Sequence, residues 1–147
     1  VVAIGGVSAP ASAKSKGYVF KYKGVSVTMN GAAKKLIKKA GKPSKKTVKK
    51  SCAYKGKDRT YTYKDFQLKT YSKTNNGAEY VSEIRFRSNK AVTKEGIRIG
   101  SSLKDVTKKY GKAKARFGVY TFKKGSSKLQ IMLNGNKVSA IRYFASK

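Results

Sequence analysis

Two nearly identical hexapeptides, VSEIRF at residues 81–86 and VSAIRY at residues 138–143, decide how the rest of this chain is interpreted. Other segments match upstream of each hexapeptide, and they do so in the same order. They are YTYK (61–64) with YTFK (120–123), and AAKKLIKKAGK (32–42) with SSLKDVTKKYGK (101–112). Matched blocks in one order indicate an internal duplication. We therefore predict a tandem repeat, with units at about residues 18–88 and 89–147.

Each predicted unit begins with a short helix. In the second unit, residues 103–110 carry an apolar stripe at helical spacing, and Ser101 or Ser102 can cap the first turn. In the first unit, residues 33–40 carry a similar stripe, with Asn30 as the expected cap. Both segments end at a glycine, which supplies the left-handed residue that commonly stops a helix.

The segments after each helix alternate between apolar and polar residues, which predicts antiparallel strands joined by hairpin turns. Each unit would then hold one helix and about three strands, which alone bury too little apolar surface to be stable. We therefore expect an α+β fold in which the two units share one continuous sheet, with both helices packed on one face. The alternation predicts these inward side chains: Ile84, Phe86, Leu129, Ile131, Leu133, Ile141 and Tyr143.

The opposite face of this sheet is predicted to be polar, aromatic and basic, so we place the candidate binding site there. The candidate binding residues are Lys69, Tyr71, Arg85, Gln130, Met132 and Arg142.

The charge of the chain is its most unusual property. Lysine and arginine number 36 against 6 acidic residues, a formal net charge of +30. Such a field attracts polyanions and is screened by salt. One basic patch is expected on the first helix and its exit, where like charges repel unless a polyanion relieves them. Its residues are Lys34, Lys35, Lys38, Lys39, Lys45, Lys46, Lys49 and Lys50.

The first thirteen residues indicate the compartment. Residues 1–13 are uncharged and apolar, and they end in Ala-Ser-Ala, which is typical of a signal peptide and its cleavage site. We interpret them as a signal-peptide remnant, the alternative being an Ala/Ser/Gly tail, and residues 14–147 as a single domain. The single Cys52 is interpreted as a small buried residue, with a reactive or intermolecular thiol as the alternative. No stretch is apolar enough for a transmembrane segment.

Catalytic chemistry finds little support in the sequence. The chain has no histidine, which removes the commonest general base and metal ligand. The six acidic residues are interpreted as local neutralisation of a lysine-rich surface. Ser101 and Lys104 match the S-x-x-K pattern, but the partner motifs of that signature are absent. We predict a protein that is not an enzyme, with no catalytic residues, no metal site and no cofactor.

The segments SCAYKGKDRTYTYKDFQLKTY, YVSEIRF and KEGIRIGSSLKDVTKKYGK resemble a group of uncharacterised secreted proteins and lipoproteins of Gram-positive anaerobes. The resemblance covers roughly Tyr18 to Phe144 and implies a tandem-repeat β-lactamase-inhibitor-like fold. Inhibitors of that fold are typically acidic or neutral and are stapled by disulfides, whereas this chain is basic and has one cysteine. No inhibitory residue is therefore carried over to this chain.

Together these features favour a secreted, monomeric binding or adhesion module, extracellular and associated with the cell wall. An anionic cell-wall polymer or another polyanion would hold it, and the sheet face would be free for a protein or glycan partner. One alternative is an extracellular nucleic-acid-binding protein that uses lysines on phosphates and tyrosines for stacking. Another is an inhibitor of a secreted or wall enzyme, by fold analogy.

Overall fold

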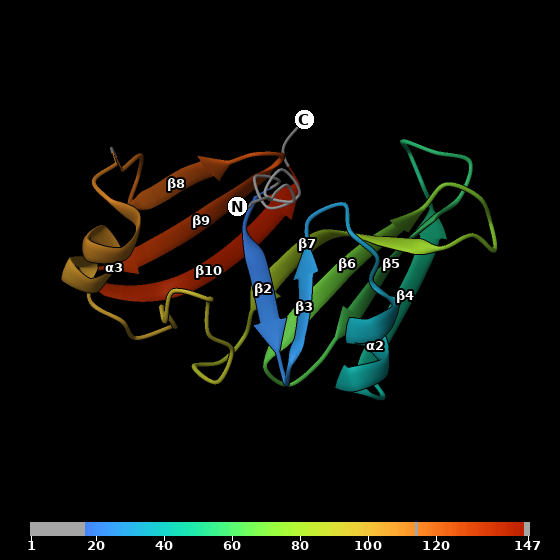
Figure 1. The fold of residues 1–147 in the computed structure, drawn as a ribbon, viewed down its shortest axis with the longest axis horizontal. Coiled ribbons are helices and arrows are strands. Elements are labelled where there is room, and N and C mark those ends of the chain that lie inside the picture. Colours follow the sequence, from blue (N-terminus) through green and yellow to red (C-terminus); the bar gives the residue numbers. More distant parts are fainter. Residues whose placement is uncertain (1–16, 114, 146–147) are drawn as a thin grey trace, which may run out of the picture.

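The computed structural model describes residues 17–113 and 115–145 (Figure 1). The predicted signal-peptide remnant at residues 1–13 lies outside the described residues. The strands are β2 (Val19–Tyr22), β3 (Val25–Thr28), β4 (Lys45–Lys50), β5 (Lys57–Thr62), β6 (Phe66–Ser72), β7 (Glu79–Phe86), β8 (Val119–Lys124), β9 (Ser127–Asn134) and β10 (Lys137–Ala145). The helices are α2 (Lys34–Ala40) and α3 (Leu103–Tyr110).

Seven strands form one antiparallel sheet in the order β4-β5-β6-β7-β10-β9-β8. The two hexapeptides lie in β7 and β10, which pair with each other in the interior of the sheet. Arg142 lies opposite Arg85, and Tyr143 lies opposite Ile84. The segments most alike in sequence are therefore neighbours in space.

Each hexapeptide also carries a β-bulge at the same place. In β7 the pairing with β6 passes from Glu83 to Val81 and leaves Ser82 unpaired. In β10 the pairing with β9 passes from Ala140 to Val138 and leaves Ser139 unpaired. The Ser82 hydroxyl donates to the Lys69 carbonyl at 3.1 Å, and the Ser139 hydroxyl donates to the Met132 carbonyl at 3.3 Å. A bulge lets two successive side chains leave the core, here at the second and third residues of each hexapeptide.

The inner face of the sheet is covered by three elements. In Figure 1 the β2-β3 hairpin crosses the middle of the sheet, with α2 toward one end and α3 toward the other. Phe20 of the hairpin packs against Phe66 and Phe86, with ring centroids 5.4 and 5.5 Å apart. Of the predicted inward side chains Leu133 is partly buried and the rest are buried, which confirms that set.

The predicted fold class, α+β with a tandem repeat of helix plus about three strands in one continuous sheet, is wrong. Strands make up 48% and helices 12% of the described residues, and β2 and β3 form a second, separate two-stranded sheet. Four strands of the large sheet follow α2, and three follow α3. The physical reason is the area of the inner sheet face that has to be covered. Two helices of 7 and 8 residues cannot bury one face of a seven-stranded sheet, so a β-hairpin covers the middle.

The two helix starts differ from each other. Ser102 caps α3 as predicted, because its hydroxyl accepts a hydrogen bond from the Asp105 N–H at 3.1 Å. The predicted Asn30 cap is wrong: α2 begins after Ala33 with no side-chain cap. Asn30 adopts a left-handed backbone (φ 66°), and its N–H donates to the Val81 carbonyl at 2.7 Å. The segment that contains Asn30 pairs with the first residues of β7, which β10 does not cover; Ala32, for example, lies opposite Tyr80.

Neither described helix could cross a membrane. The longer, α3, has 8 residues, whereas a bilayer needs about 20.

A candidate ligand cavity on the outer face of the sheet

The outer face of the sheet is strongly basic. The register places side chains on this face by alternation from Arg85 and Arg142. Eight basic side chains and two acidic ones share the face: Lys45, Lys49, Lys69, Arg85, Lys123, Lys128, Lys137 and Arg142, with Asp58 and Glu83.

The six candidate binding residues all lie on this face, around two neighbouring hollows. The larger cavity, about 580 Å³, is lined by Lys69, Tyr71 and Arg142 among others. The smaller, about 140 Å³, is lined by Arg85, Gln130, Met132 and Arg142. Arg142 lies between the two hollows and contributes to both.

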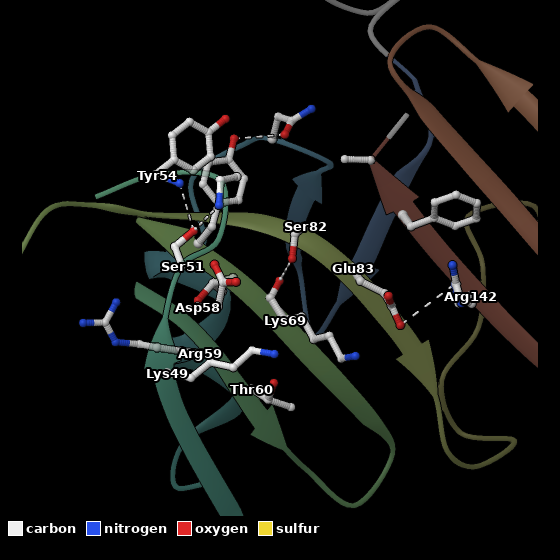
Figure 2. Close-up of a pocket in the computed structure, with 16 residues that line it drawn as sticks. Lys49, Ser51, Tyr54, Asp58, Arg59, Thr60, Lys69, Ser82, Glu83 and Arg142 are labelled. Carbon is white, nitrogen blue, oxygen red and sulfur yellow. Dashed lines mark hydrogen bonds and ion pairs between the residues drawn. The ribbon is translucent and has the colours of Figure 1, made fainter. Parts of the chain in front are cut away.

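The β4-β5 loop, residues 51–56, forms one wall of the larger cavity (Figure 2). The Ser51 N–H donates to the Gly56 carbonyl at 3.0 Å, and the Ser51 hydroxyl accepts from the N–H groups of Ala53 and Tyr54, each at 3.2 Å. A side chain at Gly56 could not be accommodated, because its Cβ would lie 2.0 Å from the Ser72 carbonyl oxygen. These contacts hold the loop in one turn against the sheet.

Two stacked tyrosines stand at the loop end of this cavity. The rings of Tyr54 and Tyr71 lie 5.0 Å apart at an interplanar angle of 14°. The Tyr71 hydroxyl donates to Asn30 Oδ1 at 3.0 Å, and burial, followed by the proximity of Tyr54, raises the pKa of Tyr71. Tyr54 is 42% exposed, so the stack leaves part of its ring open to solvent.

A carboxylate joins the two arginines at the other end of the cavity. Glu83 Oε2 lies 3.2 Å from an Arg85 nitrogen and 3.9 Å from Arg142 Nε. The Arg142 guanidinium also lies over the Phe144 ring, 4.4 Å from its centroid. Glu83 thus offsets the repulsion between two arginines that face each other across neighbouring strands.

Four acidic residues outside this face have structural roles. Asp65 accepts from Ser88, Glu79 accepts from Tyr61 and Thr70, and Glu95 accepts from Tyr110. Burial and the hydrogen bond to Glu79 raise the pKa of Tyr61. Asp105 occupies the first turn of α3, where negative charge is favourable.

Asp58 differs in position from the exposed Asp105, the other described acid whose carboxylate has no hydrogen-bond or ion-pair partner. The Asp58 side chain is half-buried and lines the larger cavity. Within residues 17–113 and 115–145 its carboxylate makes no hydrogen bond and no ion pair, although Lys49 lies opposite it in the ladder. No described lysine lies within ion-pair distance of Asp58, and its predicted role, local neutralisation of a lysine-rich surface, stays a prediction.

Tyr54, Asp58 and Asn30 also line this cavity, and none of them is among the predicted binding residues. Alternation along β5 places Asp58 on the outer face and was the one available signal for it. Nothing in the sequence signals that residues 51–56 fold over this face or that Asn30 lies beside β7.

The predicted basic patch is exposed throughout but lies on two elements. Lys34, Lys35, Lys38 and Lys39 are on α2, and Lys45, Lys46, Lys49 and Lys50 are on the edge strand β4. Lys49 also lines the larger cavity. Both ion pairs between described residues involve Glu83 and arginine, so no described lysine has a carboxylate partner.

Few described residues could bind a metal ion or react as a thiol. In the described part of the chain, no three His, Cys, Asp or Glu side chains are grouped as a metal site would require. Cys52 is exposed in the β4-β5 loop, so its interpretation as a buried residue is wrong. Residues 51–56 lie beyond the ends of β4 and β5 and beside the outer-face cavity, away from the core, so the Cys52 side chain has no core to enter.

Comparisons of the chain with protein families, with characterised proteins and with solved structures find no match.

Proposed function

We propose that this chain is a secreted, non-enzymatic binding module that attaches to an anionic polymer of the cell wall or surface. Its lysine patch on α2 and β4 makes the attachment, and the outer face of the sheet receives a ligand. The observation that carries this proposal is the absence of carboxylate partners for the lysines in the described residues. A protein with 36 basic and 6 acidic residues repels itself unless an external polyanion compensates the charge.

The placement of the lysines supports a diffuse mode of attachment. They lie on the exposed side of α2 and on the exposed edge strand β4, and they do not converge on one pocket. Lysine is a hydrated point charge on a flexible stem, which suits contact with a mobile polymer better than bidentate recognition. Attachment of this kind depends strongly on salt because it releases counterions.

The test is retention of the protein on washed Gram-positive cell walls as the salt concentration is raised to about 0.5 M. We expect release with salt, and weaker retention of the quadruple variant Lys34→Gln, Lys35→Gln, Lys38→Gln and Lys39→Gln. The matched control replaces Lys104, Lys108, Lys109 and Lys112, on and just after α3, and removes the same charge elsewhere.

Salt-independent retention would refute the electrostatic attachment. Equal losses in the two quadruple variants would show that net charge acts without a patch. Competition with double-stranded DNA separates a wall polymer from nucleic acid as the preferred polyanion.

A further inference from the structure

We propose that the larger outer-face cavity binds one sugar unit of an anionic glycan. The sugar ring would lie against Tyr54, its hydroxyls would donate to Asp58, and its carboxylate or phosphate would contact Lys49 and Lys69. This inference rests on the proposed function, because it names the kind of polymer unit that the outer face recognises.

The dimensions of the cavity suit such a unit. Its volume of about 580 Å³ falls within the roughly 300–1,000 Å³ typical of small-molecule sites. It is open on the outer face, so a polymer can continue past the bound unit. Figure 2 shows Tyr54, Ser51 and Asp58 at one end, Lys49 and Lys69 across the middle, and Glu83 with Arg142 at the far end.

Asp58 indicates that the ligand is rich in hydroxyl groups. The Asp58 carboxylate lines the cavity and pairs with no described side chain, although lysines outnumber acids heavily and Lys49 lies opposite it in the ladder. A carboxylate only accepts hydrogen bonds when ionised, so its ligand must supply donors. Sugar hydroxyls supply them. The internal phosphates of a bare phosphate chain have no donor at neutral pH, and the chain would be repelled by Asp58 and Glu83.

Lys49 and Lys69 indicate that the same ligand is acidic. Lys49 lies opposite Asp58 on β4, and Lys69 projects from β6 opposite Thr60, two residues along β5 from Asp58. The ammonium groups of Lys49 and Lys69 therefore lie near the Asp58 carboxylate without forming an ion pair with it. One ring that bears hydroxyls and an acidic group would satisfy all three side chains.

Tyr54 supplies a flat apolar surface for the ring. Its position is held by the Ser51 hydrogen bonds on one side and by the stack on Tyr71 on the other. Because Asn30 in turn holds the Tyr71 hydroxyl, little side-chain freedom is lost when a ligand binds.

The experiment measures binding by calorimetry at about 0.15 M salt with four probes. Two probes are acidic sugars: tetragalacturonate has carboxylates, and glucose 6-phosphate has a phosphate. Maltotetraose is a neutral sugar, and tetrapolyphosphate is an anion that contains no sugar. We expect at least one acidic sugar to bind more tightly than both maltotetraose and tetrapolyphosphate. The tighter of the two acidic sugars identifies the acidic group.

Asp58→Asn separates this site from general charge attraction. The substitution raises the positive charge by one, so diffuse attraction alone predicts tighter binding of every anion. A sugar site predicts instead a loss of roughly tenfold or more for the acidic sugar, since hydrogen bonds to a charged group are strong. Asp105→Asn on α3 makes the same charge change and is expected to leave acidic-sugar binding unchanged or slightly tighter.

Tyr54→Ala tests the ring contact and is expected to weaken acidic-sugar binding while leaving tetrapolyphosphate binding unchanged. Thermal unfolding of each variant checks that it folds. Unchanged or tighter acidic-sugar binding by both Asp58→Asn and Tyr54→Ala would overturn the proposal, as would a preference of the wild type for tetrapolyphosphate. Salt-dependent wall retention that survives these variants would leave the proposed function standing.

Discussion

Strands β7 and β10 share one six-residue pattern, with the same bulge and the same serine-to-carbonyl hydrogen bond, but they differ at two positions. Glu83 of β7 corresponds to Ala140 of β10, and Phe86 corresponds to Tyr143. The first difference lies on the outer face and separates a polar cavity with a carboxylate from a small hollow lined by Met132 and Ala140. The second lies in the core. Shared backbone features thus hold the sheet, while single side chains set the chemistry of each half.

The largest expected effect tests whether the two strands contribute equally to the core. Ile84 and Ile141 occupy the same place in the pattern, and both are fully buried. We expect Ile84→Ala and Ile141→Ala each to lower the free energy of unfolding by about 2–5 kcal/mol, because each leaves a cavity. Denaturant unfolding measures this, with Met132→Ala on the outer face as a mild control. A large difference between the two isoleucine variants would break the equivalence of the strands.

The next effect concerns the core position where the strands differ. Burial, followed by the nearby charge of Glu95, raises the pKa of Tyr143 in the folded protein. The folded state then keeps its proton where the unfolded chain loses it, so stability is complete below about pH 10 and falls as the pH rises further. Tyr143→Phe copies the β7 residue and removes this loss.

The magnitude follows from linkage: at pH 11 the variant should retain at most about 1.4 kcal/mol more of its neutral-pH stability than the wild type. Unfolding curves at pH 8, 10 and 11 measure the difference. Parallel loss in both proteins would show that other tyrosines dominate, with Tyr61 and Tyr110 as the next to test, because the pKa values of both are also raised.

A smaller effect is expected at the outer-face position. Glu83→Ala copies β10 and leaves Arg85 and Arg142 facing each other without a carboxylate. Because both arginines are partly exposed to solvent, we expect a loss of about 1 kcal/mol that shrinks as salt is added. Glu83→Gln keeps the shape and removes the charge. If Gln were as stable as Glu in low salt, the carboxylate charge would not hold the arginines together.

The smallest effects concern the serines of the two bulges. Ser82→Ala should cost about 1 kcal/mol, and Ser139→Ala less, because Ser82 is half-buried whereas Ser139 is exposed. Thermal unfolding of the two single variants and the double variant measures this. A cost at Ser139 equal to or above that at Ser82 would contradict the role of burial.

Several features followed from local pattern alone. Alternation placed Ile84, Leu129 and Ile141 in the core, and Ser102 was identified as a helix cap, because both depend on residues a few positions apart. The same alternation placed all six candidate residues on the outer face. The separate hairpin, the role of Asn30 and the partnerless Asp58 were missed, since each depends on segments far apart in the chain.

The sequence by itself determined the charge, the alternation that divides the sheet into a core face and a basic face, and the kinship of the two hexapeptides. These are properties of composition and of neighbours along the chain. Only the tertiary structure decided that the hexapeptides pair with each other, that a hairpin covers the inner face, and that residues 51–56 bend over Asp58 to make a cavity. Such arrangements depend on which surfaces remain to be buried once the sheet has formed, and no local pattern records that.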